Sequence, residues 1–333
     1  MKNDSEAIVV AKNLSKHFPA GGGGLAGLLT GRPKKVLRAV DGVSLEVRRG
    51  ETFALVGESG CGKSTLARLL AGLYTPTSGS LVLFGEDVSS GKRSRALTRR
   101  LNMIFQDPYA SLNPRWRIGD IVAEPLRVQH AELGEAEIAR RVAEALDLVG
   151  LPADAVSKYP HQFSGGQRQR ISIARVLSGA PELVICDEPT SALDVSVQAQ
   201  VLNLMKELQQ RRAMTYLFIS HNLAVVHHMA DRIGVMYLGR IVEIAEKKAL
   251  FAEPLHPYTR MLLDAIPRIG EKGRAHRTPV AGEVPSPLDP PSGCTFHPRC
   301  PRACERCSKE APLMRAVKTP EGLRFVACHM AGK

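Results

Sequence analysis

The hydrophobic pattern of this chain alternates between short apolar runs and longer stretches with helical spacing. Residues 52–56, 183–186 and 216–219 are apolar runs of strand length. Residues 136–148 and 195–211 instead repeat apolar positions about every three to four residues, which is typical of amphipathic helices. Because parallel strands need crossover connections, this alternation predicts an α/β fold with a mostly parallel sheet and helices on its faces.

The N-terminal part of the chain also predicts strands. Residues 8–18 form a first strand pattern, and residues 36–40 and 43–47 alternate as two paired strands near a sheet edge would. A turn at Ser78-Gly79-Ser80 leads into a further short strand at 81–84. Residues 19–35 are glycine-rich and basic, which predicts a long loop or insertion.

The middle and the end of the chain differ from this pattern. Residues 107–178 are mainly helical in pattern, so we expect an inserted helical subdomain between two parts of a core, residues 1–106 and 179–238. Beyond residue 239 the pattern weakens, and a stretch rich in proline and glycine follows. Five of the seven cysteines lie after that stretch. We therefore expect residues 239–333 to form a separate C-terminal extension.

The composition narrows the class of protein. A chain of 333 residues with 44% hydrophobic and 23% charged residues can bury a large core. No apolar stretch approaches the ~18 residues of a membrane-spanning helix, and the charged N-terminus lacks the apolar segment of a signal peptide. These features favour the cytosol, where cysteines stay reduced and a disulfide framework is not expected.

The chain is basic, with a formal net charge of +12. This sign is compatible with nucleic acid, anionic lipid or polyphosphate ligands and does not choose between them. One local cluster comprises Lys92, Arg93, Arg95, Arg99 and Arg100. We interpret it as a solvated helix face, which is the common role of such a run.

A phosphate-binding loop follows the strand at 52–56. Residues 57–65, GESGCGKST, fit the pattern G-x-x-x-x-G-K-[ST] and precede a helical pattern. The glycines allow successive backbone N–H groups to face phosphate oxygens, Lys63 can reach the β- and γ-phosphates, and the Ser64 hydroxyl can ligate magnesium. The sequence therefore predicts binding of a nucleoside triphosphate at a helix N-terminus. The predicted contacts are Gly57, Ser59, Gly60, Cys61, Gly62, Lys63, Ser64 and Thr65.

Two adjacent carboxylates end the strand at 183–186. Asp187 can hold magnesium through water, and Glu188 can orient and activate an attacking water. Alone, such a pair would indicate only an exposed strand end. After an apolar strand in a chain that carries the phosphate loop, it indicates hydrolysis of the triphosphate.

A second anion site is predicted at Ser164, Gly165, Gly166 and Gln167. The hydroxyl, the bare backbone N–H groups and the helix that follows would together favour a bound anion. With this Ser-Gly-Gly-Gln element, the phosphate loop and Asp187-Glu188 in that order, the sequence resembles an ABC-type ATPase cassette. The resemblance implies a P-loop NTPase core of the RecA-like type, a helical subdomain that carries the signature, and hydrolysis of ATP to ADP and phosphate.

Further site residues follow from this resemblance. Gln106 matches the glutamine that contacts magnesium and water and senses the membrane partner. His221 matches the switch histidine that contacts the γ-phosphate. Asp194 lies in the loop between subunits, and Phe18 matches the aromatic residue that stacks on adenine, although a role in the core is the alternative. Magnesium would be held by Ser64, Gln106 and Asp187.

The resemblance also implies a mode of action. Two cassettes pack head to tail, and each ATP lies between one chain's phosphate loop and the partner's signature. Glu188 would be a competent base, and Ser164–Gln167 would act on nucleotide held by the second cassette. ATP would close the dimer and hydrolysis would reopen it.

The C-terminal third resembles a narrower family. Residues 220–243, 256–267 and 293–301 look like the ATP-binding subunits of dipeptide and oligopeptide importers, a family whose nickel and glutathione importers share much of this pattern. It implies a complex of two different cassettes, two membrane permeases and an extracytoplasmic solute-binding protein, with this chain peripheral on the cytoplasmic face of the inner membrane. Permeases would dock near residues 107–125, where Trp116 could contact them or pack the subdomain.

Four C-terminal cysteines match a pattern that holds a [4Fe–4S] cluster in some members of that family: Cys294, Cys300, Cys307 and Cys328. Four thiolates are the usual ligands of such a cluster. The spacing is loose, and Cys304 forms a Cys-x2-Cys pair with Cys307, so zinc and free thiols stay open as alternatives. Cys61 and Cys186 are interpreted as ordinary small residues.

Two other hypotheses assign different functions to this chain. A soluble ABC ATPase acting on nucleic acid would suit the basic charge, but such proteins usually carry two cassettes in one chain or a long coiled coil, and neither pattern occurs here. In the other reading the cysteine module senses redox state or iron and gates the ATPase. The transported substrate is not encoded in this chain, because the substrate contacts the other subunits.

Overall fold

The computed structural model describes residues 6–20, 35–265 and 282–331. Within these ranges the strands of the larger sheet are ordered β11-β12-β10-β9-β3-β8-β7-β6. The five strands from β9 to β6 are parallel, while β10, β12 and β11 are antiparallel additions at one edge. The predicted α/β fold with a mostly parallel sheet is therefore confirmed. The parallel strands are β3 (Thr52–Val56), β6 (Leu101–Ile104), β7 (Leu183–Asp187), β8 (Thr215–Ile219) and β9 (Arg232–Tyr237).

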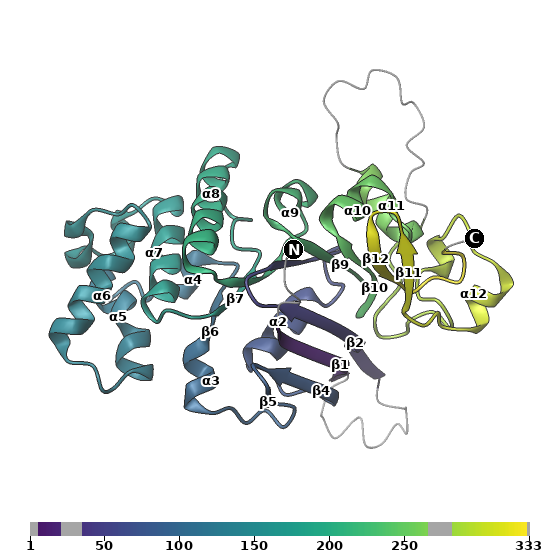
Figure 1. Ribbon diagram of the computed structural model, residues 1–333, viewed down its shortest axis with the longest axis horizontal. Coiled ribbons are helices and arrows are strands. Elements are labelled where there is room, and N and C mark those ends of the chain that lie inside the picture. Colours follow the sequence, from purple (N-terminus) through teal and green to yellow (C-terminus); the bar gives the residue numbers. More distant parts are fainter. Residues whose placement is uncertain (1–5, 21–34, 266–281, 332–333) are drawn as a thin grey trace, which may run out of the picture.

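A smaller antiparallel sheet, ordered β2-β1-β4-β5, lies below the first in Figure 1. Its strands are β1 (Ala7–Ala20), β2 (Lys35–Arg48), β4 (Ser78–Leu83) and β5 (Glu86–Asp87). The prediction of two paired strands at 36–40 and 43–47 was wrong. They are one strand, β2, which pairs along its whole length with β1. The pairing shifts register at several points, and the sequence pattern is therefore interrupted in a way that resembles a turn. The predicted loop falls largely on residues 21–34, outside the described residues.

Apolar cores lie on both faces of the parallel sheet. On one face, α2 (Lys63–Ala71) and the small sheet pack together, with Leu66, Leu70, Leu55 and Ile185 fully buried among them. On the other face, α8 (Val195–Arg212) and α9 (Leu223–Met229) cover the sheet. Because the strands are apolar on both faces, their sequences are continuous apolar runs rather than alternating ones.

Helices between β6 and β7 pack on one another at the left of Figure 1. They are α4 (Pro108–Ser111), α5 (Ile118–Gln129), α6 (Glu135–Leu148) and α7 (Gly165–Ser178), with two 3-10 turns, Ala153–Ser157 and Pro160–Gln162. Helical spacing had predicted α6 almost to the residue. This group corresponds to the helical region expected at 107–178.

The C-terminal part was the least well predicted from the sequence. It supplies β10 (Arg240–Glu246), α10 (Lys247–Ala252), α11 (Pro257–Asp264), the 3-10 turn His297–Arg299, α12 (Glu305–Lys309), β11 (Arg315–Thr319) and β12 (Gly322–Val326). Rather than standing apart, this segment continues the large sheet through β10 and β12. Hydrophobic residues of β10 and α11 share a core with β9 and α9.

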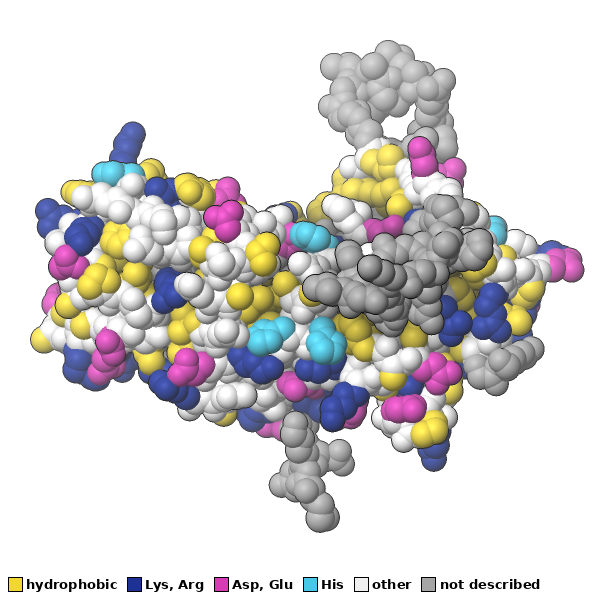
Figure 2. Space-filling model, turned by 90° about the horizontal axis from the view of Figure 1, so that it is seen from above, with side chains coloured by type: hydrophobic (Ala, Val, Ile, Leu, Met, Phe, Trp, Pro, Cys, Tyr) yellow, Lys and Arg dark blue, Asp and Glu magenta, His cyan; other side chains and the backbone are white. Residues whose placement is uncertain are grey.

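The basic cluster at 92–100 is used structurally. Arg93 is half-buried and donates to the carbonyl oxygens of Leu69 and Leu70 at the C-terminus of α2. Arg99 and Arg100, at the end of α3 (Arg95–Arg100), pair with acidic side chains. On the face shown in Figure 2, Lys and Arg side chains are interspersed with Asp and Glu. Arg93, Arg99 and Arg100 therefore bind other parts of the protein, whereas the sequence predicted a solvated helix face.

Candidate active site

The phosphate loop runs from the end of β3 to the start of α2 and is packed tightly against its neighbours. A Cβ atom at Gly62, whose φ is 106°, would lie 2.0 Å from the carbonyl oxygen of Ala39 on β2. A Cβ at Gly57 would lie 2.1 Å from the carbonyl oxygen of Met236 on β9. No other residue fits at these two positions, because any side chain would enter neighbouring backbone. The loop is therefore held between two strands that are remote in sequence.

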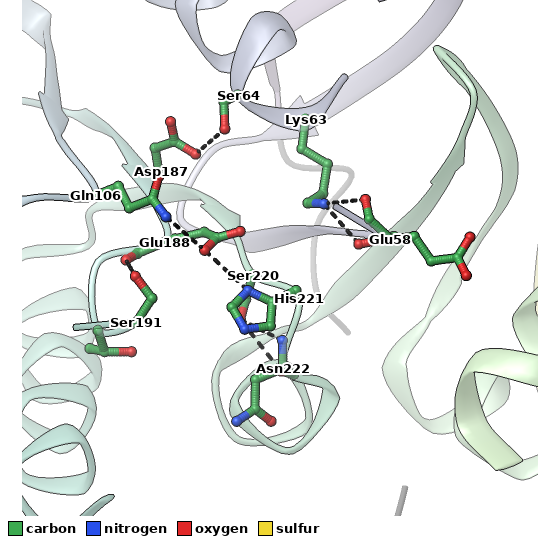
Figure 3. A network of polar contacts seen from close by, with 12 residues as sticks. Glu58, Lys63, Ser64, Gln106, Asp187, Glu188, Ser191, Ser220, His221 and Asn222 are labelled. Carbon is green, nitrogen blue, oxygen red and sulfur yellow. Dashed lines mark hydrogen bonds and ion pairs between the residues drawn. The ribbon is translucent and has the colours of Figure 1, made fainter. Parts of the chain in front are cut away.

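Lys63 begins α2, and its ammonium group lies inside the loop. Its Nζ atom donates to the carbonyl oxygens of Gly57 at 2.7 Å and Glu58 at 2.9 Å (Figure 3). The side chain is buried. A single ammonium with three donors can exchange such contacts for phosphate oxygens that enter the same loop. The positive charge is thus positioned by backbone carbonyls of the loop.

A hydroxyl and a carboxylate meet beside the loop. The Oγ atom of Ser64 donates to Oδ1 of Asp187, at the end of β7, over 2.8 Å (Figure 3). Burial raises the pKa of Asp187, and the hydrogen bond from Ser64 opposes this shift. Oxygen donors of these two kinds are those that Mg²⁺ prefers. The residues present therefore fit a magnesium ion bound together with a nucleoside triphosphate.

Glu188 is the centre of the polar network in Figure 3. Its Oε2 atom accepts from Nε2 of Gln106 at 3.2 Å and lies 3.0 Å from Nδ1 of His221. Its carbonyl oxygen accepts from the Ser191 hydroxyl at 3.1 Å. The ends of β6, β7 and β8 lie at one edge of the parallel sheet, which is why residues that are distant in sequence meet here. The predicted group of Gln106, Glu188 and His221 is brought together.

The backbone at Glu188 is held in an unusual conformation. Its φ is 47°, in the left-handed region, which costs a non-glycine residue about 1–3 kcal/mol. The N–H of Glu188 donates to the carbonyl of Ile219 on β8 at 3.0 Å, so neighbouring structure compensates this strain. Strained residues of this kind are typical of active sites, where they direct a functional side chain. Sequence reasoning gave no sign of this strain.

The predicted signature forms a well-capped helix start. Ser164 caps α7: its Oγ accepts from the Gln167 N–H, and the Gln167 side chain accepts from the Ser164 N–H at 2.9 Å. A Cβ at Gly166 would lie 2.3 Å from the Val197 side chain on α8. The polar bonds of this turn are made within the turn, and Ser164 and Gln167 are exposed. Such an exposed helix N-terminus is available to a group from another molecule.

The other predicted nucleotide contacts lie on several different elements. Ser59 and Gly60 are exposed, while Cys61 is buried, and burial raises the pKa of its thiol. Phe18 is half-buried near the end of β1, edge-on to Tyr74 with ring centres 5.4 Å apart. Asp194 is exposed at the start of α8. Thr65 lies in the first turn of α2.

The prediction of an iron–sulfur cluster at the C-terminal cysteines was wrong. Cys294, Cys300, Cys307 and Cys328 do border one small pocket. Across the described residues, however, no group of three or more His, Cys, Asp or Glu side chains is arranged to hold a metal ion, so the arrangement supports neither the cluster nor zinc. The sulfur atoms of Cys304 and Cys307 lie 3.5 Å apart, farther than the bond length of a disulfide.

The sequence reasoning also missed contacts to Glu58, the second residue of the phosphate loop. Its carboxylate forms a two-point ion pair with Arg299, and its N–H donates to the Tyr258 hydroxyl at 2.9 Å. Both partners belong to the C-terminal segment, about 200 or more residues away along the chain. Glu58 lies at an unrestricted position of the phosphate-loop motif, and Tyr258 and Arg299 lie in stretches 256–267 and 293–301, which carried only a family resemblance. Nothing in these patterns linked the three residues to one another.

Among the described residues, no helix is both long and apolar enough to cross a membrane. The packed phosphate loop, the Ser64–Asp187 pair and the Glu188 network at the edge of a parallel sheet define a P-loop nucleoside triphosphatase.

Comparisons with known proteins narrow this class. The family described as "ABC transporter" matches residues 40–191, and the family described as "Oligopeptide/dipeptide transporter, C-terminal region" matches residues 242–307. The chain is 49% identical to a putative oligopeptide transport ATP-binding protein of Bacillus subtilis, over 97% of this chain and 95% of that protein. It is 49% identical to a di/tripeptide transport ATP-binding protein of Pseudomonas aeruginosa, over 98% of both chains.

A solved structure supports the same assignment. A dimeric ATP-binding cassette in a post-hydrolysis state, bound to ADP and Pi, superimposes with a TM-score of 0.62 at 26% identity, over 72% of this chain and 98% of that one. This chain therefore belongs to the ABC transporter family of ATP-binding proteins and carries the C-terminal region of the oligopeptide/dipeptide branch. It is an ABC-type ATPase, for which ATP and Mg²⁺ are the implied ligands.

Proposed function

We propose that this chain hydrolyses ATP to power the import of dipeptides or oligopeptides through a heteromeric ABC importer. The observation that carries the proposal is similarity along almost the whole chain, including the C-terminal region, to proteins named for peptide transport. Similarity in the ATPase core alone would leave the substrate class open, since ABC cassettes serve many transporters. The extension is what distinguishes this branch.

Each residue of the site is assigned a role on the basis of its position. Lys63 and the N–H groups of the loop bind the β- and γ-phosphates, and Ser64, Asp187 and Gln106 hold magnesium, directly or through water. Glu188 is the general base for the attacking water, with His221 beside it at 3.0 Å. Phe18 stacks on adenine. The geometry around Glu188 supports this assignment, because one carboxylate oxygen is shared by Gln106 and His221.

The exposed signature supports a second cassette as partner. Ser164, Gly165, Gly166 and Gln167, with Asp194, would face the ATP that is bound to the second ATPase subunit. Their exposure and the helix N-terminus at Ser164 support this role. We further propose that residues 107–178 act as one helical subdomain between two parts of the core, 1–106 and 179–238, with 239–333 as the extension.

A groove beside Gln106 is the proposed contact with the membrane permeases. It has a volume of about 200 Å³ and is lined by residues of β6, α5 and α7, among them Val128 and Arg175, and by Phe105, which directly follows β6. Phe105 is 42% exposed and Val128 76%, so two large apolar side chains of one groove face solvent, which favours a partner. Trp116, outside the groove lining, is 42% exposed. This contact would place the chain on the cytoplasmic face of the membrane as a peripheral subunit. Cysteines introduced beside Trp116 should form disulfides with a permease cysteine; failure to do so in every nucleotide state would contradict docking here.

Transport by the reconstituted complex tests the proposed substrate. The chain would be assembled with two permeases, a second ATPase subunit and a solute-binding protein. We expect ATP-dependent uptake of a labelled dipeptide or tetrapeptide into proteoliposomes, abolished by Lys63→Ala. Excess unlabelled peptide should compete, whereas nickel and glutathione should not. Uptake of nickel or glutathione without uptake of peptide would contradict the peptide assignment and leave the ATPase assignment intact.

A further inference from the structure

Glu58 is held by the C-terminal segment on two sides. Its backbone N–H donates to the hydroxyl of Tyr258, on α11, at 2.9 Å. Its carboxylate receives two hydrogen bonds from Arg299, at 2.8 and 3.0 Å. On the opposite side its carbonyl oxygen accepts from Lys63 Nζ at 2.9 Å (Figure 3). Every polar group of this loop residue is therefore engaged.

The contact with Tyr258 bears directly on Lys63. The N–H of Glu58 and the C=O of Gly57 belong to the same planar trans peptide, so they point in opposite directions. The Tyr258 hydroxyl binds the N–H, and Lys63 Nζ donates to that C=O at 2.7 Å. Because the peptide is rigid, fixing its N–H also fixes its carbonyl oxygen. Tyr258 thereby sets one of the two acceptors that position the Lys63 ammonium.

Arg299 fixes the side chain of the same residue. The side chain of Arg299 is only 3% exposed, and its two terminal nitrogens pair with both oxygens of the Glu58 carboxylate. A two-point guanidinium–carboxylate pair restrains orientation as well as distance. Packing of a nearby residue restrains Arg299. Phe296 lies three residues before it in the chain, and the Phe296 ring lies 5.4 Å from that of Tyr258 and 5.3 Å from that of Tyr237. These rings join Arg299 and Tyr258 into one packed unit.

We propose that Arg299 and Tyr258 are positioning residues for ATP turnover, by which the C-terminal extension holds Glu58 and so sets the place of Lys63 in the phosphate loop. Neither residue needs to touch ATP. Tyr258 holds the backbone N–H of Glu58 and Arg299 holds its carboxylate, so the integrity of the extension controls how well the loop receives phosphates. Displacement of the extension would release Glu58. The proposal depends on ATP hydrolysis by this chain and is independent of the transported substrate.

Kinetics of the assembled transporter test this proposal. Arg299→Met keeps the length and packing of the side chain but removes the ion pair. We expect the KM for ATP to rise about tenfold, because the free energy of one charge-assisted contact corresponds to a change of about that size. The kcat should change by less than about threefold, since Glu188 is untouched. Arg299→Lys, which retains one charged contact, should fall between. Tyr258→Phe removes one hydroxyl only, and its KM should rise about threefold.

A matched control lies in the same extension. Arg306 pairs with Glu310 on the exposed surface of α12, away from the loop, so Arg306→Met should leave the KM unchanged. Thermal unfolding of each variant would be recorded, and kinetics measured well below the lowest midpoint. A purely structural role would lower the unfolding midpoint of Arg299→Met and Tyr258→Phe while their KM values stayed within about twofold of wild type; that result would overturn the proposal. If Arg299→Met fails to fold, an unchanged KM in Tyr258→Phe overturns it alone.

Discussion

Replacement of Glu188 by glutamine is the most direct test of the chemistry at the site. The substitution keeps the size of the side chain and removes its charge and its ability to accept a proton. Glutamine still offers an oxygen to Gln106, whose Nε2 donates to Glu188 over 3.2 Å. The left-handed backbone, with φ of 47°, is no easier for glutamate than for glutamine, so folding should be little affected.

The expected magnitude follows from the contacts. Glu188 interacts with Gln106, His221 and Ser191, whereas the phosphate-binding ammonium of Lys63 is held by Gly57 and Glu58. ATP affinity should therefore stay within about threefold of wild type. Loss of a general base typically lowers the rate about 10²- to 10⁴-fold, equivalent to about 3–5 kcal/mol in the activation free energy.

Phosphate release by the reconstituted transporter is the assay, with binding of a fluorescent ATP analogue measured on the same preparations. Glu182→Gln is the matched control, since Glu182 directly precedes β7 while Glu188 follows it. Glu182 pairs with Arg49 and Arg100 near the protein surface, so its loss should leave kcat unchanged. Glu188→Gln protein that turns over ATP at more than about a tenth of the wild-type rate would refute the assignment of Glu188 as the base.

Three further predictions concern the loop and the scaffold around it. Gly62→Ala should abolish ATP binding and lower the unfolding midpoint, because its Cβ would lie 2.0 Å from the Ala39 carbonyl oxygen. Gly134→Ala is the control, since the space around Gly134 is open. Equal ATP binding and equal unfolding midpoints of the two variants in calorimetry would contradict the prediction. Arg93→Met should cost about 1–3 kcal/mol in urea unfolding, because two charge-assisted bonds to carbonyls at the end of α2 are lost; a change below about 0.5 kcal/mol would mean that they contribute nothing. Burial lowers the pKa of His256 to about 3 from 6.5, so the unfolded chain binds the proton more readily, and stability should be full above pH 6.5 and decline as the pH falls toward 3. Between pH 7.5 and 5 the loss from this residue is about 2 kcal/mol, and His256→Asn should remove that part of the slope; identical slopes in the two proteins would show that another group is responsible.

The sequence could predict that the candidate site residues lie close together because each element there is local. A phosphate loop needs glycines at fixed spacing, and the strand before it and the helix after it are short and strongly patterned. Gln106, Asp187 and His221 each follow closely on an apolar strand, and the carboxyl ends of parallel strands meet at one sheet edge. Once the strands are assigned, their proximity follows from topology alone.

Elements that depend on tertiary contact were predicted poorly. β2 was divided into two strands because its pairing with β1 shifts register several times, and such shifts leave no consistent alternation to follow. β10 was not recognised although Ile241, Val242, Ile244 and Ala245 are all buried, since a continuous apolar run of this length does not by itself distinguish a strand. The metal site failed for a related reason: spacing along the chain placed four cysteines in one region, but did not determine whether their sulfur atoms could converge.

The phosphate-loop motif explains why the role of Glu58 could not be predicted from the sequence. In the motif, the residue after Gly57 is unrestricted, because the nucleotide reads the backbone there and not the side chain. That freedom allows a lineage to use the side chain for another contact, and in this chain the contact is a buried arginine 241 residues further on. A variable position inside an otherwise constrained loop is thus a point where an appended segment can act on the loop without altering the residues that bind phosphate. The same reasoning requires that Glu58→Gln reproduce the effect of Arg299→Met, since both remove one ion pair from opposite ends.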